Sequence, residues 1–303
     1  PLMKDKYTKG EITNRELRNN VTTSLSINAL SLNTDGSHVH LSGSVRNLDE
    51  LHYDLKSSME IDLATARVYI PDSLVQNVKG QVSANINTRG VLPDSINARF
   101  LDYFLQNSSA NFHFRNVDID LDTTWSFQNV SGRLGYIDSA FELDSFSVYI
   151  PKYELSLVDN KLNAHFGSKV SDLDSWIIEV PYCHVETSKS SLKGVVSVNN
   201  LNHPVFSLQS ELNIDLAEIK PFIPDSLLKS IEGHVTARIN SEGTLNLDSL
   251  TEQIPGIVYD HSTFDIDLKS VNVEMPDTLL NVHKVNGRVS INPNLVTIQD
   301  LSG

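Results

Sequence analysis

Residues 61–90 read IDLATARVYIPDSLVQNVKGQVSANINTRG, and residues 214–243 read IDLAEIKPFIPDSLLKSIEGHVTARINSEG. The two stretches align without a gap, and half of their positions are identical. The identities include the motif Ile-Pro-Asp-Ser-Leu, at Ile70–Leu74 and Ile223–Leu227, and a glycine after it. Agreement of this extent indicates that the chain contains two copies of one unit.

The similarity continues on both sides of these stretches. Upstream, INALSLNT at 27–34 aligns with VPYCHVET at 180–187, and downstream NVSGRL from Asn129 aligns with KVNGRV from Lys284. The unit is therefore roughly 150 residues long, which predicts an elongated, stackable architecture. We expect a first β repeat with an N-terminal lead-in at 1–179 and a second, truncated repeat at 180–303, continuous with the first.

Apolar and polar residues alternate with a period of two in many segments of the chain. Val82, Ala84 and Ile86 show the pattern, and so do Phe264, Ile266 and Leu268. This alternation is typical of strands with one apolar and one polar face, and antiparallel sheets are the kind that leave one face in water. The sequence therefore predicts a mainly β protein with an antiparallel sheet and a few short helices.

The alternation changes parity once within the first copy. Phe112 and Phe114 precede the break, and Val117 and Ile119 follow it. A β-bulge or a short interruption near Arg115–Asn116 accounts for the change. One extra residue in the strand brings the apolar side chains after it back to the face of the sheet on which those before it lie.

Few segments have a helical pattern. Asp94–Gln106 begins with a capping residue and places its apolar residues on one face. Leu63–Tyr69 and Leu216–Phe222 are predicted to form a short helix or turn in each copy, and Ile-Pro-Asp-Ser a sharp corner after it. Four glycines bracket a strand in the two copies and are predicted to serve turns: Gly80, Gly90, Gly233 and Gly243.

The composition excludes several classes of function. The 303 residues carry a net charge of −14, which argues against binding of nucleic acid or of anionic lipid headgroups by charge. A single cysteine, Cys183, allows no intramolecular disulfide. No apolar run is long enough to span a bilayer, and no signal peptide is visible. Because the chain stops within its repeating pattern, we expect it to be a fragment of a longer, anchored protein.

No catalytic site, metal site or cofactor is predicted. Asp118, Asp120 and Asp122 resemble the start of a calcium loop, but apolar residues alternate with them, as on a solvated strand face. His38 and His40 could share one side of a strand, and a third ligand is missing nearby. Cys183 and His184 are adjacent and so point to opposite faces, and Cys183 aligns with a leucine, as a core residue would.

The block at Asp62–Gly90 and Asp215–Gly243 resembles the periplasmic region of AsmA-like proteins, especially the long versions of Bacteroidetes. The strands at Asn286–Val289 and Leu192–Val195 add to this resemblance. The resemblance implies a curved, elongated sheet with a hydrophobic groove, related to TamB and to bridge-like lipid transfer proteins. It also implies a periplasmic location, an inner-membrane anchor outside this chain, and a part in outer-membrane biogenesis and lipid homeostasis.

A repeated sheet with one apolar face must either cover that face or use it, and flexible acyl chains suit such a surface. We therefore expect a non-enzymatic protein that handles phospholipid or another lipid. The residues predicted to line the groove are Val82, Ala84, Ile86, Val117, Ile119, Leu121, Val235, Ala237, Ile239, Phe264, Ile266 and Leu268.

Two alternatives stay open at this point. One is a scaffold that assembles outer-membrane proteins through exposed strand edges. The other is a cell-surface adhesin or glycan-binding tandem of closed β-sandwiches. The sequence does not determine the lipid, the direction of transport or the oligomeric state.

Overall fold

The fold is described from a computed structural model. It describes residues 5–16, 19–71, 75–92, 98–121, 125–245, 256, 260–276, 281–293 and 295–303. Most of these residues lie in strands, and short helical segments join some of them.

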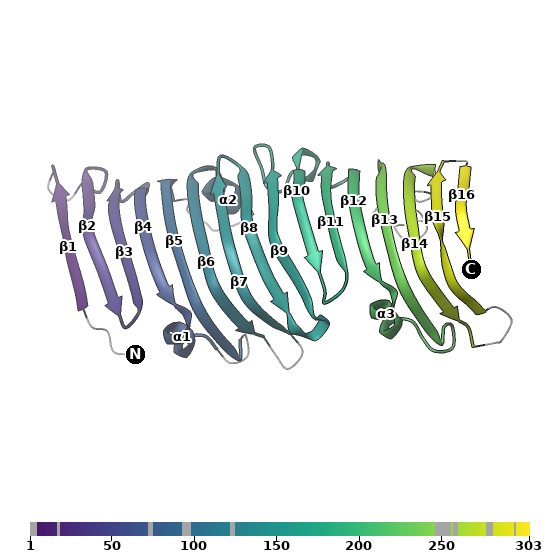
Figure 1. Cartoon of the computed structure of the whole chain (residues 1–303). Helices are drawn as coiled ribbons and strands as arrows, with labels where there is room; N and C mark the ends of the chain where they lie inside the picture. Colours follow the sequence, from purple (N-terminus) through teal and green to yellow (C-terminus); the bar gives the residue numbers. More distant parts are fainter. Residues whose placement is uncertain are drawn as a thin grey trace. The chain divides into compact units, whose positions relative to one another are not determined.

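Sixteen strands follow one another in the sheet in the order in which they occur in the chain (Figure 1). They are β1 (Asp5–Asn14), β2 (Thr23–Thr34), β3 (Ser37–Arg46), β4 (His52–Asp62), β5 (Asn77–Val91), β6 (Ser108–Asp120), β7 (Ser126–Ile137), β8 (Ala140–Ile150), β9 (Leu155–His165), β10 (Ile177–Glu186), β11 (Ser191–Asn199), β12 (Val205–Asp215), β13 (Ser230–Thr244), β14 (Ser262–Glu274), β15 (Asn281–Asn292) and β16 (Leu295–Ser302). Because β1 and β16 are the two ends of this order, the sheet is not closed. The prediction of a mainly β protein with an antiparallel sheet and few short helices is confirmed.

The chain divides into two compact units. Unit 1 comprises Pro1–Lys152 and Asn163–Leu173, and unit 2 comprises Tyr153–Leu162 and Asp174–Gly303. Each unit is described by itself below. The sequence repeat, with its boundary at 179/180, stays a prediction.

The helical segments are short. They are α1 (Leu63–Ala66), η1 (Arg67–Tyr69), α2 (Ala98–Gln106), η2 (Pro151–Tyr153), η3 (Leu173–Ser175), α3 (Leu216–Ile219) and η4 (Lys220–Phe222). The predicted segments 63–69 and 216–222 are therefore confirmed at both ends. The predicted helix at 94–106 is described from Ala98, and its proposed cap, Asp94, lies outside the described residues.

An aspartate begins the helical turn in each unit. The Asp62 carboxylate accepts a hydrogen bond from the backbone N–H of Thr65 at 2.8 Å, and that of Asp215 accepts one from Ala217 at 3.0 Å. These bonds satisfy N–H groups that a helix start leaves free. After η4, Ile223–Leu227 forms the predicted turn, whereas Asp72, Ser73 and Leu74 of the first motif lie outside the described residues.

The predicted bulge in β6 is confirmed. The register between β6 and β7 shifts between Phe114 and Val117, and Asn116 has a φ of 47°. Asn116 faces Gly80 of β5, where the register also shifts and φ is 106°. A Cβ on Gly80 would overlap the carbonyl oxygen of Asn116, so this close approach requires glycine.

The prediction that four glycines serve turns is wrong. Gly80 and Gly90 lie inside β5, and Gly233 and Gly243 lie inside β13. Gly80 and Gly233 permit bulges, since a Cβ on Gly233 would lie 2.7 Å from the carbonyl oxygen of Ser270. Gly90 makes room for the Tyr103 side chain of α2. Glycine marks close approaches here, and the sequence alone does not separate these from turns.

Candidate functional site: the apolar face of each unit

An unbroken row of apolar side chains crosses seven strands of unit 1. Each member lies directly opposite the next across the sheet: Leu32, Val39, Met59, Ala84, Phe112, Leu134 and Leu143, from β2 to β8. Directly opposed residues point to the same face. At the usual spacing between strands, the row is about 29 Å long.

Unit 2 has a row of the same kind. Its members are Val185, Leu192, Leu212, Ala237, Ile266, Val289 and Ile298, from β10 to β16. The central member is alanine in both rows, Ala84 on β5 and Ala237 on β13. Each unit therefore has an apolar face that runs across its strands.

The structure brings most of the predicted groove residues onto these faces. In unit 1, Val82 and Ile86 flank Ala84 on β5 and oppose Phe114 and Ala110 of β6. The bulge at Asn116 returns Val117 and Ile119 to the same face, where they oppose Val130 and Phe127. In unit 2, Val235, Ala237 and Ile239 oppose Leu268, Ile266 and Phe264, so all six predicted residues lie together.

Leu121 is the exception among the predicted residues. It follows the last residue of β6 and is 41% exposed. Its backbone N–H donates to the carbonyl of Trp125 and not to a residue of a neighbouring strand's ladder. The period-two pattern extends one residue beyond the hydrogen-bonded strand.

The residues of the apolar face are only partly buried. Among the twelve predicted side chains, Ala84, Val117 and Ala237 are buried, eight are half-buried and Leu121 is exposed. The solvent-accessible surface of the chain is 19163 Å². A compact protein of this mass exposes about 12,700 Å², and two separate compact proteins of half the mass expose about 15,300 Å² together. In the described part of the chain, only short helical segments accompany the sheet, and no second layer of comparable size is present to reduce the exposed area.

Charged side chains are missing from the central strands of this face in unit 1. The residues that point to it from β4, β5 and β6 are Tyr53, Leu55, Ser57, Met59, Ile61, Val78, Val82, Ala84, Ile86, Thr88, Gly90, Ser108, Ala110, Phe112, Phe114, Val117 and Ile119. Their neighbours along β4 and β5 include Asp54, Lys56, Glu60 and Arg89, which are exposed on the other face. The two faces of the sheet therefore differ sharply in chemistry.

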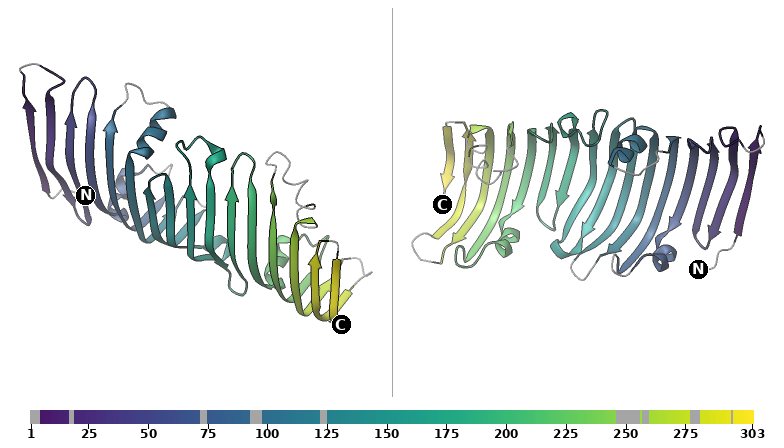
Figure 2. Two further views of the ribbon diagram at one scale, coloured as in Figure 1. Left: turned by 90° about the horizontal axis from the view of Figure 1, so that it is seen from above. Right: turned by 180° about the vertical axis from the view of Figure 1, so that it is seen from behind.

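Helix α2 covers one end of the apolar face in unit 1. Gly90 is on this face, and the Tyr103 side chain packs against it, with its hydroxyl accepting a hydrogen bond from the backbone N–H of Val91. The Asp102 carboxylate accepts from the N–H of Val170 at 2.9 Å, and the Gln106 side chain donates to the carbonyl of Ser168. Figure 2 shows α2 standing off the strands on one side.

An aromatic cluster lies on the apolar face of β7 and β8. The rings of Tyr136 and Phe141 are 4.6 Å apart, and Phe166 is 6.5 Å from Tyr136 and 6.1 Å from Phe141. Tyr136 is only 5% exposed. Burial raises its pKa, and Ser139 offsets part of this effect.

The aspartates of the calcium-like pattern are used within the sheet. Asp118 accepts from the N–H of Asn129 at 2.7 Å and pairs with Lys79 at 2.9 Å. Burial opposes its ionisation, but these two partners outweigh burial and lower its pKa. Asp120 accepts from the Ser126 hydroxyl at 2.6 Å, and Asp122 lies outside the described residues. No group of three or more metal-binding side chains occurs in the described part of the chain.

The histidine and cysteine candidates also have ordinary partners. His38 and His40 point to the same face of β3 and contact Asn33 at 3.1 Å and Ser31 at 3.0 Å. Cys183 is half-buried on the apolar face opposite Gly194, and burial raises its pKa, which disfavours the reactive thiolate.

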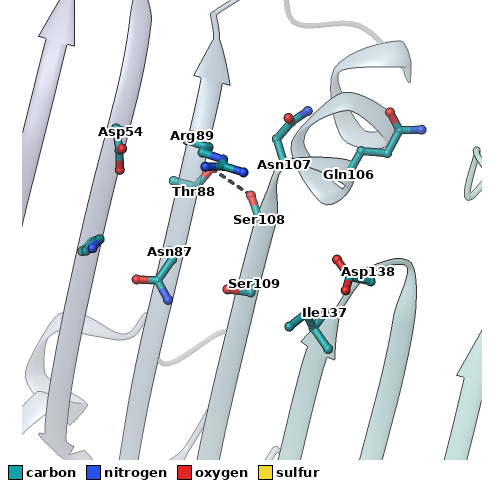
Figure 3. A pocket seen from close by; sticks show the side chains of 11 residues that line it. Asp54, Asn87, Thr88, Arg89, Gln106, Asn107, Ser108, Ser109, Ile137 and Asp138 are labelled. Atoms are coloured by element: carbon teal, nitrogen blue, oxygen red, sulfur yellow. Dashed lines mark hydrogen bonds between the residues drawn. The ribbon is translucent and has the colours of Figure 1, made fainter.

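Hollows occur on the polar face as well. One of about 380 Å³ is lined mainly by polar side chains of β4, β5 and β6 near the end of α2 (Figure 3). On the apolar face of unit 2, a smaller hollow of about 130 Å³ is lined in part by Val185, Leu192, Leu212 and Ile214. We place the candidate site on the apolar faces because an apolar row runs across each of them without interruption.

Reasoning from the sequence missed most members of each row: it named only Ala84 in unit 1, and only Ala237 and Ile266 in unit 2. Leu32, Val39 and Met59 belong to the row as fully as Ala84 does. The signal was present, because each of them lies in a segment of alternating apolar residues. The pairing of distant strands, which aligns those segments into one row, has no local signature.

Comparisons with family models, with curated proteins and with solved structures found no match to this chain. Among the described residues, no helix has the length and apolar character needed to cross a membrane.

Proposed function

We propose that this chain is a non-enzymatic, lipid-handling part of an AsmA-like envelope protein. In this proposal the apolar faces hold phospholipid acyl chains in the periplasm, in a protein anchored in the inner membrane, and the process served is outer-membrane lipid homeostasis. The observation that carries the proposal is the uninterrupted apolar row in each unit, whose side chains carry no charge and are mostly half-buried.

The dimensions and chemistry of the rows favour acyl chains as the ligand. A row of about 29 Å is comparable to the hydrocarbon thickness of a bilayer, so it can hold extended chains along its length. Large exposed apolar surfaces are rare on soluble proteins unless they bind something. The net charge of −14 supports recognition through apolar contact and not through attraction to anionic headgroups.

The open topology favours this proposal over a tandem of closed β-sandwiches. That alternative requires two domains in which a second sheet covers the apolar face. The strand order instead runs through one antiparallel sheet that does not close.

Lipid binding can be tested directly on the purified protein. Native mass spectrometry and organic extraction after gentle purification should find bound phospholipid. A fluorescent phosphatidylcholine should bind, and Leu134→Lys or Val289→Lys should weaken binding by about tenfold, because a charge then sits in the apolar row.

The matched controls are Asn87→Lys and Asn240→Lys, which add the same charge to exposed positions next to Ile86 and Ile239. They should bind the lipid as the unchanged protein does. A folded protein that yields no phospholipid and does not bind the fluorescent lipid would overturn the proposal.

A further inference from the structure

Five hydroxyl groups gather at one end of the apolar face of unit 1. They belong to Tyr53 on β4, Thr88 on β5, Tyr103 on α2, Ser108 on β6 and Tyr136 on β7, and we call them the hydroxyl cluster. On β4, β5 and β6, the rest of this face is almost entirely apolar.

The strand register places these residues together. Tyr53 lies directly opposite Gly90, against which Tyr103 packs. Thr88 is two residues before Gly90 on the same face, about 7 Å away. Ser108 opposes Thr88, and Figure 3 shows the hydrogen bond between them, at 2.8 Å.

Tyr136 joins the cluster from β7. It opposes Ala110, which is two residues after Ser108 and on the same face of β6. The cluster therefore spans four neighbouring strands and is covered in part by α2.

Several hydroxyl protons in the cluster lack an acceptor among the described residues. Ser108 donates to Thr88, and the N–H of Val91 donates to Tyr103, so Thr88 and Tyr103 are used as acceptors. The oxygens of Tyr53 and Tyr136 are inaccessible to solvent, and neither phenol proton has an acceptor among the described residues. Ser139 lies beside Tyr136 and can act on its oxygen only as a donor, since it lowers the pKa of that phenol. A buried hydroxyl without a partner costs about 1–3 kcal/mol, and most native hydroxyls avoid this cost.

On the described strands of unit 2, the part of the cluster that satisfies itself is retained and the two phenols are not. Ser241 and Ser262 align with Thr88 and Ser108, and their hydroxyls form the same bond at 2.8 Å. The residues aligned with Tyr53 and Tyr136 are Phe206 and Ile291, which have no hydroxyl. The fold therefore does not need the two phenol groups, and unit 1 carries them for another reason.

The donors are neutral, which limits the ligand that they suit. Among the described side chains of β4, β5 and β6, no Lys or Arg points to this part of the face, since Lys56 and Arg89 are exposed on the other one. Neutral hydroxyl donors without a cation stabilise an uncharged acceptor better than a phosphate or a carboxylate, whose charge would be desolvated without compensation.

We infer that the hydroxyl cluster binds the carbonyl oxygen of an acyl ester or amide, and that it holds the polar end of a bound lipid beside α2. This inference rests on the proposed function, since the apolar row must hold the rest of the chain. It adds an orientation: the acyl chains extend from the cluster along the apolar face of unit 1.

The test compares two phosphatidylcholines with the same chain lengths, one ester-linked and one ether-linked. They share the headgroup and the hydrocarbon, but the ether lipid has no carbonyl. The unchanged protein should prefer the ester lipid by about fivefold, the effect of one ordinary hydrogen bond. The double variant Tyr53→Phe/Tyr136→Phe should bind both lipids equally.

The matched control is Tyr7→Phe/Tyr69→Phe, which removes two phenol hydroxyls from exposed positions. It should keep the preference for the ester lipid. Equal binding of the two lipids by the unchanged protein, or a preference that survives in Tyr53→Phe/Tyr136→Phe, would overturn the inference while the proposed function stands. Failure to bind either lipid would overturn both.

Discussion

The corner after β4 in unit 1 and the corner after β12 in unit 2 are built in the same way. Each begins at a capping aspartate and continues through one helical turn and one 3-10 turn. In each, a basic side chain contacts the carbonyl of the isoleucine before proline: Arg67 contacts Ile70 at 2.7 Å, and Lys220 contacts Ile223 at 3.4 Å. The shared side chains are therefore those that form hydrogen bonds with backbone N–H and carbonyl groups at the corner.

The differences between the two units lie elsewhere. Glu218 of α3 binds the hairpin between β10 and β11, whereas the aligned residue of α1 is Thr65. Unit 1 has the phenols of Tyr53 and Tyr136 on its apolar face, and unit 2 does not. Where a residue is not needed by the strand or the corner, the two units have diverged, and these positions are the ones to examine for function.

The largest effect is expected at the bulge glycines. Gly80→Ala and Gly233→Ala each place a Cβ against a backbone oxygen at a positive φ, and each should lower the free energy of unfolding by about 3 kcal/mol. Urea unfolding is followed by the fluorescence of Trp125, which lies in unit 1, and of Trp176, which lies in unit 2. A loss below about 0.5 kcal/mol in both variants would show that the bulges are not constrained as described.

A smaller effect, specific to unit 2, is expected at Glu218. Its carboxylate accepts hydrogen bonds from the hydroxyls of Thr187, Ser188 and Ser190 and from the N–H of Lys189. Burial opposes ionisation, but these donors outweigh it and lower the pKa from 4.5 to about 2. Because solvent screens this group, we expect Glu218→Gln to destabilise unit 2 by only about 1 kcal/mol.

The depressed pKa also fixes the direction of the pH dependence. The stabilisation is fully present above pH 4.5 and is lost as the pH falls from 4.5 to about 2, because the unfolded state binds the proton first. In the unchanged protein, the melting temperature reported by Trp176 should therefore fall as the pH is lowered from 4.5 to about 2. In Glu218→Gln, the part of this pH dependence that comes from Glu218 should be absent. Identical slopes in the two proteins would contradict the assigned role.

The capping aspartates test whether the two corners are equivalent. Asp62→Ala and Asp215→Ala should each cost about 1 kcal/mol, since each removes one cap bond. Urea unfolding should show nearly equal losses, each in its own unit. A loss in only one unit would mean that the corners share a shape but not their energetics.

The smallest effect is expected for an ion pair that only unit 2 contains. Arg288 lies 2.9 Å from Asp267 on the polar face, whereas the aligned residues of unit 1 are Arg133 and His113. Exposed pairs contribute little and are screened by salt, so Arg288→Met should leave the urea midpoint of unit 2 unchanged. A clear shift of the midpoint would show that this exposed ion pair contributes to the stability of unit 2.

Much of the fold was predictable because its signals are local. The two seven-residue segments after Asp62 and Asp215 share one pattern, and their helical turns begin and end where the sequence predicts. The bulge at Asn116 was visible as a change in parity between Phe114 and Val117. Alternation along β5 placed Val82, Ala84 and Ile86 on one face, as the structure does.

The rest depends on contacts between distant strands. Nothing near Thr88 indicates that it opposes Ser108, because that pairing follows from the register of β5 and β6. The close approach of Tyr103 to Gly90 likewise depends on where α2 packs. The hydroxyl cluster and the full length of each apolar row therefore emerge only in the folded chain.

Site-specific crosslinking tests most directly whether the apolar face is the one that holds lipid. A photoreactive phenylalanine analogue is placed at Ile86 or Ile239 on that face, or at Asn87 or Asn240, the next residue along each strand and on the other face. On irradiation with bound phosphatidylcholine, Ile86 and Ile239 should crosslink to the lipid, and Asn87 and Asn240 should not. Equal crosslinking from all four positions, or crosslinking only from Asn87 and Asn240, would contradict the account.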